Sequence, residues 1–317
     1  MEKAPGNGTR PRTRPTIRQL EYAVAVAEHL HFRRAAEACH VTQPALSTQV
    51  QALEETLGVQ LFERAARKVL LTPVGREVVA QARRVLAEAD GLSDTARAAR
   101  EPLAGLLRLG VIPTVAPYLL PRVLPGLRDR FPRLELFLRE EFTHVLLQRL
   151  NEGELDVLLL ALPLAGEVEA LPLFRDEFRL AVPARHPLAG RSRVQDSDLV
   201  DQEVLLLEDG HCLRDQALAI CNHAGAREAS RMRATSLGTL TQMVAGGLGT
   251  TLLPKMALDV EGRAGGVRVI PFTEPTPYRE IGLAWRKASS RAPEYRELGR
   301  VLVELVEGER VPVTPNS

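Results

Sequence analysis

The chain has 317 residues and a formal net charge of +1, with 26% charged and 45% hydrophobic residues. This composition is typical of a soluble globular protein and excludes a uniformly basic nucleic-acid binder. No apolar run approaches the roughly 18 residues of a membrane-spanning helix, so we expect a cytoplasmic protein with no membrane partner. The charge is uneven, because residues 1–100 hold 15 Lys and Arg against 11 Asp and Glu.

The N-terminal third predicts a small helical domain. Residues 1–15 form a basic tail rich in Pro and Gly that we expect to be disordered. Residues 16–73 predict three helices followed by two short strands. The third helix begins at Gln43-Pro44, where Thr42 can cap it, and it ends at Gly58. A second helix, a tight turn and a third helix are typical of a helix-turn-helix.

The polar face of the third predicted helix is suited to reading DNA. Gln side chains can read adenine edges, Ser and Thr can reach bases or phosphates, and Arg and Lys bind the phosphate backbone. The alternative is a plain three-helix bundle with a polar surface. The candidate DNA-binding residues are Arg33, Arg34, Gln43, Pro44, Ser47, Thr48, Gln49, Arg64, Arg67 and Lys68.

The remaining chain predicts a long helix and a larger domain. Residues 74–101 predict one helix with an apolar stripe that favours dimerisation, formed by Val74, Val78, Val85 and Leu92. Residues 102–309 alternate strand and helix patterns, which indicates an α/β domain with a mostly parallel sheet. Because about 210 residues exceed a typical single-sheet domain, we expect two α/β lobes with a cleft. Residues 310–317 form a tail.

Residues 19–58, 61–64 and 71–75 closely resemble the winged helix-turn-helix of LysR-type transcriptional regulators. The resemblance covers residues 16–308. It implies a linker helix and a two-lobed effector domain like the periplasmic binding proteins. It also implies a regulator without enzyme activity, whose partners are double-stranded promoter DNA, RNA polymerase and further copies of itself in a dimer or tetramer.

Two cysteines lie nine residues apart in the effector segment. Cys212 falls in the first turn of a predicted helix, where backbone dipoles favour a thiolate, and His211 and Arg214 add donor or positive character. Cys221 follows in an apolar setting. Nine residues of continuous helix span about 13.5 Å, whereas a disulfide needs Cα atoms within about 7 Å. The pair is therefore either two unrelated core thiols or a redox switch that remodels the helix.

Residues 109–121, 205–221 and 233–237 resemble the hydrogen peroxide-sensing activators among the LysR-type regulators. The resemblance implies that peroxide oxidises Cys212 to a sulfenic acid and that Cys221 resolves it as a disulfide. It also implies that Thr114, Thr143 and His211 line the peroxide pocket and that Arg279 lies near it. From the residues alone, the two threonines are also expected to cap the helices that follow them, and the two roles are compatible.

Two rival functions stay open at this point. One is a LysR-type regulator whose cleft binds a small metabolite, with the two cysteines incidental. The other is a thiol peroxidase, which the predicted DNA-binding domain and the lack of a recognisable peroxidase motif disfavour. No His, Cys and carboxylate cluster has the spacing of a zinc site, so we expect neither a metal nor another cofactor.

Overall fold

The computed structural model describes residues 14–65, 68–98, 103–164, 166–200, 202–263 and 265–308. The chain forms two compact units, residues 1–90 and 91–317. Within the described residues, no helix combines the length and apolar character needed to cross a membrane.

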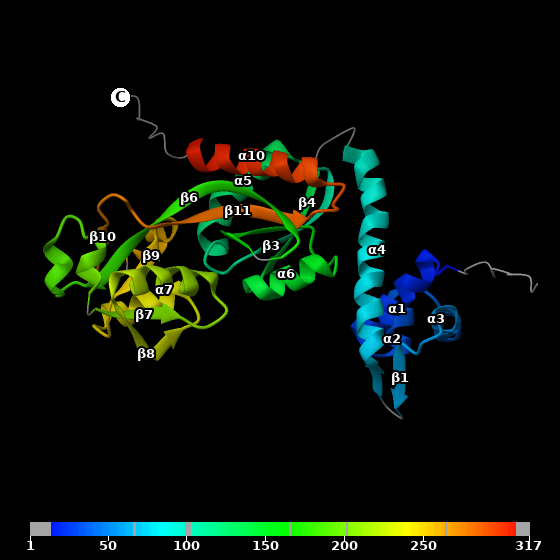
Figure 1. The fold of residues 1–317 in the computed structure, drawn as a ribbon. Coiled ribbons are helices and arrows are strands. Elements are labelled where there is room, and N and C mark those ends of the chain that lie inside the picture. The colour runs from blue at the N-terminus through cyan, green and yellow to red at the C-terminus, as the bar shows by residue number, and fades with distance from the viewer. Residues whose placement is uncertain are drawn as a thin grey trace, which may run out of the picture. The chain divides into compact units, whose positions relative to one another are not determined.

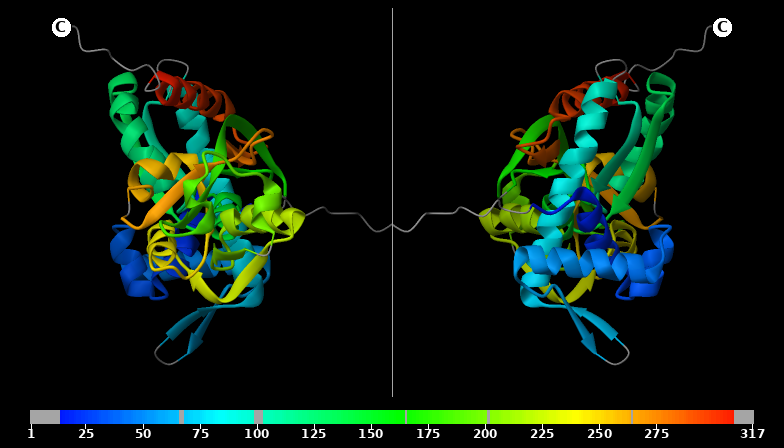
Figure 2. Two further views of the ribbon diagram at one scale, coloured as in Figure 1. Left: turned by 90° about the vertical axis from the view of Figure 1, so that its left-hand side faces the viewer. Right: turned by 90° about the vertical axis from the view of Figure 1, so that its right-hand side faces the viewer.

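The N-terminal unit contains the three predicted helices and the hairpin. Its elements are α1 (Ile17–His29), α2 (Phe32–Ala38), α3 (Gln43–Leu57), β1 (Phe62–Ala65), β2 (Lys68–Leu71) and most of α4 (Pro73–Ala98), as far as Asp90. Gly58 ends α3 with φ +70°, as predicted, whereas the Thr42 side chain makes no capping hydrogen bond. The β1–β2 hairpin projects from the helices as an arm (Figure 2).

Helix α4 presents two different apolar faces. Val79 and Ala82 are buried in the core of the N-terminal unit, and Val78 packs partly against that core. Val74, Val85 and Leu92 are exposed, Leu92 by 76%. Val78 is therefore better assigned to the edge of the core than to the exposed stripe in which the sequence pattern placed it.

The C-terminal unit has two hydrophobic cores, which define its lobes. Lobe I is built on β3 (Gly105–Val111), β4 (Leu134–Glu140), β5 (Val157–Leu162), β11 (Tyr278–Arg286) and the first half of β6 (Val168–Pro183). Helices α5 (Ala116–Arg130) and α10 (Ala292–Gly308) lie side by side along this sheet, with α6 (Thr143–Asn151) on its other face (Figure 1).

Lobe II takes up the second half of β6. Its other strands are β7 (Glu203–Leu207), β8 (Arg227–Ala234), β9 (Thr251–Pro254) and β10 (Val267–Pro271). Its helices are α7 (Cys212–Ala224), α8 (Leu237–Ala245) and α9 (Leu258–Glu261), with 3₁₀ turns at Pro187–Gly190, Asp196–Leu199 and Lys255–Ala257. Strand β6 pairs with β11 in lobe I and with β9 and β10 in lobe II, so one strand belongs to both lobes.

The prediction of a mostly parallel sheet is wrong. Strand β3 pairs in parallel with β4 and β5, but β6 and β11 run antiparallel to each other, and β9 and β10 run antiparallel to β6. The alternation of strands and helices predicts parallel neighbours only while the chain stays in one lobe. Here β6 leaves lobe I and β11 returns to it, which places two opposed crossing strands side by side.

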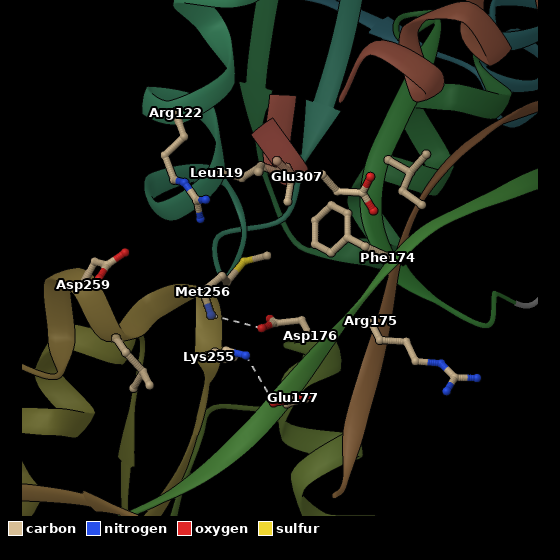
Figure 3. Close-up of a pocket in the computed structure, with 13 residues that line it drawn as sticks. Leu119, Arg122, Phe174, Arg175, Asp176, Glu177, Lys255, Met256, Asp259 and Glu307 are labelled. Atoms are coloured by element: carbon tan, nitrogen blue, oxygen red, sulfur yellow. Dashed lines mark hydrogen bonds and ion pairs between the residues drawn. The ribbon is translucent and has the colours of Figure 1, made fainter. Parts of the chain in front are cut away.

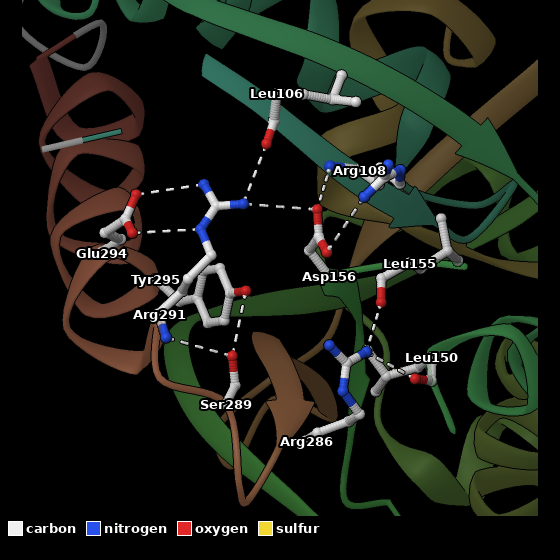
Figure 4. A network of polar contacts seen from close by, with 10 residues as sticks. All are labelled: Leu106, Arg108, Leu150, Leu155, Asp156, Arg286, Ser289, Arg291, Glu294 and Tyr295. Carbon is white, nitrogen blue, oxygen red and sulfur yellow. Dashed lines mark hydrogen bonds and ion pairs between the residues drawn. The ribbon is translucent and has the colours of Figure 1, made fainter. Parts of the chain in front are cut away.

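A buried ionic network fixes the point where the chain enters lobe I. The Arg291 guanidinium lies 3.2 Å from both carboxylate oxygens of Glu294 and donates to the Leu106 carbonyl at 3.0 Å (Figure 4). Glu294 also accepts the Leu103 backbone N–H at 3.2 Å. The first described residues after α4 are thereby tied to the start of α10.

Candidate functional site

Helix α3 presents the polar face that the sequence predicts. Gln43, Pro44, Thr48 and Gln49 are exposed and Ser47 is half-buried, while Leu46 and Val50 are fully buried beneath them. The Thr48 hydroxyl donates to the Pro44 carbonyl at 2.9 Å, so it is engaged along the helix in this conformation. The exposed amides are therefore the groups available to read base edges.

The cationic residues predicted to bind phosphates differ in their exposure, pairing and position. Arg33 and Arg34 are exposed at the start of α2, and Arg33 pairs with Glu37 at 3.0 Å. Arg64 and Lys68 belong to β1 and β2 themselves rather than to the connection between the strands, and Arg67 lies outside the described residues.

Glu54, which was not among the predicted site residues, fixes the wing formed by β1 and β2. Glu54 of α3 accepts the backbone N–H groups of Leu61 and Phe62 at 2.7 and 3.1 Å. This carboxylate holds the start of the hairpin against α3. Only the position of an acid near the end of the helix could have suggested it.

The two effector cysteines lie on one unbroken helix but in different environments. Cys212 is the first residue of α7 and is half-buried against the core of lobe I, although α7 belongs to lobe II. Cys221 is buried in the core of lobe II. Burial raises the pKa of the Cys221 thiol to about 11, with a smaller contribution from Glu228, so this thiol is protonated at neutral pH. A disulfide requires α7 to unwind.

His211 immediately precedes Cys212 and lies against lobe I. Its ring is 4.6 Å from the Phe142 ring, with the two planes 82° apart, and Phe142 directly precedes Thr143. Burial lowers the pKa of His211, against the opposite effects of a hydrogen bond to the Thr235 backbone and of Glu208. The imidazole is therefore favoured as a neutral donor or acceptor rather than as the positive group considered from sequence.

Two buried polar atoms at this corner are unsatisfied. Neither Nε2 of His211 nor Oγ1 of Thr143 has a hydrogen-bond partner within the described part of the chain. Buried polar atoms are normally paired, so unsatisfied ones mark a place where a small polar molecule can bind. His211 adjoins Cys212 in sequence, and its ring contacts Phe142, the residue before Thr143.

Among the predicted pocket residues, Arg279 and Thr114 are joined directly by hydrogen bonds. The buried Arg279 guanidinium donates to the Thr114 hydroxyl and carbonyl, both at 2.9 Å, and to Asp176 Oδ2 at 2.9 Å. The capping role expected for the two threonines is wrong: Val115 and Phe142 are the N-cap residues of α5 and α6, and Thr143 follows as the first residue of α6. Asp176 was not predicted, because nothing local distinguishes it within a long strand.

An ionic cluster fixes the segment around Cys212 to β8. The buried Arg214 pairs with Asp209 at 2.8 Å and with Glu228 at 3.0 Å, and Arg233 pairs with the same two acids. The positive charge that the sequence analysis placed near Cys212 is therefore largely neutralised by carboxylates.

A cavity of about 660 Å³ lies against the crossing strand β6. Figure 3 shows Asp176 at its wall, accepting the Met256 backbone N–H at 3.0 Å, and Lys255 next to Glu177. Its lining carries charges of both signs: Arg122, Arg175 and Lys255, with Asp176, Glu177, Asp259 and Glu307. Its volume suits a small-molecule ligand.

Comparison with known proteins places both units in one family. Residues 17–76 match the model of the bacterial regulatory helix-turn-helix protein, lysR family, and residues 100–307 match the LysR substrate binding domain.

Relatives match over nearly the whole chain. A probable hydrogen peroxide-inducible genes activator from Streptomyces viridosporus is 52% identical, over 92% of this chain and 95% of its own. The DNA-binding transcriptional dual regulator OxyR of Escherichia coli K12 is 48% identical, over 92% of this chain and 96% of its own.

Solved structures of OxyR proteins also match over nearly the whole chain. A full-length OxyR variant from Pseudomonas aeruginosa, in which an aspartate replaces one cysteine, is 40% identical with a TM-score of 0.77, and the match covers 92% of this chain and 98% of that one. An H2O2-bound cysteine-to-serine mutant of Corynebacterium glutamicum OxyR is 38% identical with a TM-score of 0.66, and the match covers 94% of each chain. The chain belongs to the LysR family of bacterial transcription regulators.

Proposed function

We propose that this chain is a hydrogen peroxide-responsive transcriptional activator of the OxyR type. The observation that carries the proposal is the contact at the start of α7, where His211 precedes Cys212 and packs on Phe142, the residue before Thr143, while His211 Nε2 and Thr143 Oγ1 stay unsatisfied within the described chain. The relatives named as peroxide-inducible activators support the same conclusion. The family is one of transcription regulators, not of enzymes.

The first chemical step is oxidation of Cys212. Its thiolate attacks one oxygen of hydrogen peroxide, an S–O bond forms, the O–O bond breaks, and hydroxide leaves and takes up a proton to become water. Sulfur is oxidised and peroxide is reduced. We assign the hydrogen bonds to the peroxide oxygens to the neutral His211 and the Thr143 hydroxyl. Arg279 acts indirectly, because it positions Thr114.

The second step joins the two cysteines. The Cys221 sulfur attacks the sulfenic sulfur of Cys212, and the departing hydroxyl leaves as water with the Cys221 proton. Because Cys221 is buried and protonated in the reduced chain, it must leave the core of lobe II before it reacts. Disulfide formation therefore remodels α7 and breaks the Arg214 ion pairs.

The output is binding to promoter DNA. We assign Gln43, Ser47 and Gln49 to base reading, and Arg33, Arg34 and the hairpin cations Arg64, Arg67 and Lys68 to phosphate contacts. Pro44 and Thr48 lie on the same helix face. The exposed stripe of α4 supports self-association into a dimer, and pairing of dimers gives a tetramer. Activation requires contact with RNA polymerase.

Mass spectrometry tests the proposal. Full-length protein is treated with stoichiometric peroxide without reductant, and promoter binding is measured in parallel. A Cys212–Cys221 disulfide is expected in the wild type. Cys221→Ser should retain a sulfenic acid at Cys212, and Cys212→Ser should respond in neither assay. An unmodified Cys212 in the wild type would contradict the proposal.

The cavity on β6 supports a second candidate function, regulation by a small metabolite. In that case the two cysteines are incidental. Promoter binding would then change with a ligand in the Cys212→Ser variant as it does in the wild type.

A further inference from the structure

A phenylalanine from lobe I lies directly on the segment that carries the reactive cysteine of lobe II. Phe142 contacts the His211 ring at 4.6 Å and stacks on His144 at 6.1 Å, with the latter two planes 15° apart. A Cβ added to Gly210 would lie 3.8 Å from the Phe142 ring and 3.6 Å from His144 Cε1. The aromatic pair therefore rests on the turn immediately before Cys212.

The contact controls both the position and the environment of His211. An edge-to-face aromatic pair shifts an equilibrium by a factor of roughly 2 to 10 beyond the burial of its surface. The Phe142 ring also contributes to the burial that keeps His211 neutral, and Nε2 stays without a partner in the described chain. A neutral imidazole held here can accept a hydrogen bond from peroxide, whereas the imidazolium cannot.

We propose that Phe142 is a positioning residue of the peroxide response, which holds His211 against the Thr143 corner in the reduced chain. The proposal rests on the proposed function and adds a residue that acts only through His211. When the contact is lost, the turn before Cys212 is free to move. Phe142 therefore speeds the oxidation of Cys212 and slows the later rearrangement of α7.

The pH dependence follows from the groups that surround this imidazole. They are Glu208 on its own turn, His144 on α6, and the ion pairs of Asp209 with Arg214 and Arg233 beyond Gly210. Without the Phe142 ring, water reaches His211 and its pKa rises towards the ordinary value of 6.5. The neutral form is then lost at a higher pH, so the acid limb of the oxidation rate moves upward.

The test compares Phe142→Leu with Phe137→Leu in the full chain. Phe137 is exposed on β4, so the control makes the same chemical change away from His211. Both variants carry Cys221→Ser, and the rate of sulfenic acid formation at Cys212 is followed by trapping and mass spectrometry from about pH 5 to 8. Phe142→Leu should react roughly 2 to 10 times more slowly, with its acid limb at higher pH, whereas Phe137→Leu should match the parent.

A second measurement follows the disulfide with Cys221 present. Once Cys212 is oxidised, Phe142→Leu should form the Cys212–Cys221 bond faster than the wild type. Phe142→Tyr keeps the ring and should restore the parent oxidation rate and pH profile. Phe142→Met, with a similar apolar volume and no ring, replaces Phe142→Leu if the latter does not fold.

The outcomes separate the two proposals. If Phe142→Leu or Phe142→Met is oxidised at the parent rate with an unchanged pH profile, Phe142 has no positioning role and the proposed function stands. If the parent protein is not oxidised at Cys212 by stoichiometric peroxide, the proposed function itself fails.

Discussion

Asp176 and Arg279 face each other on the two crossing strands and form a fully buried ion pair, with 2.9 Å between Oδ2 and Nε. Each partner also reaches a different lobe, because Arg279 binds Thr114 of lobe I and Asp176 accepts the Met256 N–H of lobe II. The pair therefore joins both lobes to the strands between them.

Removing the acid should destabilise the effector domain strongly. Asp176→Ala leaves the Arg279 charge buried without its partner, which costs about 3–5 kcal/mol in the free energy of unfolding. Denaturant unfolding measures the loss. Glu304→Ala, which removes one partner of the exposed Arg300, is the control and should cost less than about 1 kcal/mol. Equal losses for the two variants would contradict the bridging role of the pair.

The buried Cys221 thiol should make the folded protein sensitive to alkali. Its pKa is raised from 9.0 to about 11, so the folded chain holds this proton more tightly than the unfolded chain. The stability that the protonated thiol contributes is complete below about pH 9 and is lost as the pH rises towards 11. The total loss is roughly 2–3 kcal/mol in the free energy of unfolding.

To check this, the free energy of unfolding of the reduced protein is measured as a function of pH, for the wild type and for Cys221→Ala. Cys221→Ala should be less stable than the wild type at neutral pH, because it leaves a small cavity. It should, however, lose less stability between about pH 9 and 11. Parallel curves for the two proteins would show that the thiol does not titrate with unfolding.

The polar face of α3 should determine operator binding. Ser47→Ala or Gln43→Ala should weaken specific binding by roughly 1–3 kcal/mol if one base contact is lost. Gel shifts at fixed salt measure the effect, and circular dichroism should show an unchanged fold. Gln148→Ala, an exposed glutamine on α6, is the matched control. Undiminished affinity in both α3 variants would mean that another surface reads the DNA.

The exposed stripe on α4 should carry self-association. Val85→Asp and Leu92→Asp should shift the protein to smaller species in analytical ultracentrifugation, because a dimer interface would bury an unpaired charge. Val78→Asp is a poorer test, since Val78 packs partly into the N-terminal core and its loss also destabilises that unit. Unchanged assembly in the first two variants would mean that other surfaces join the copies.

Local sequence patterns predicted the helices and strands better than they predicted which strands pair with each other. Helix α3 begins at Gln43 and ends at Gly58, as the sequence indicates. The pairing of β6 with β11 was missed because it joins segments about a hundred residues apart, and no short-range signal encodes that register.

The same limit applies to the site. The cysteines, threonines and histidine are recognisable from their sequence context, whereas Asp176, Glu228 and Phe142 act through contacts that only the folded chain creates.

The sharing of β6 between the lobes also dictates the order in which the two lobes can fold during synthesis on the ribosome. The strands and helices of lobe II lie between residues 178 and 272, so this lobe can close as soon as that segment has emerged. Lobe I must wait for β11 and α10, which follow lobe II in the chain. Until then β5, whose six residues are all buried in the finished protein, has one unpaired edge. Nascent chains interrupted before residue 278 should therefore need chaperones and aggregate readily.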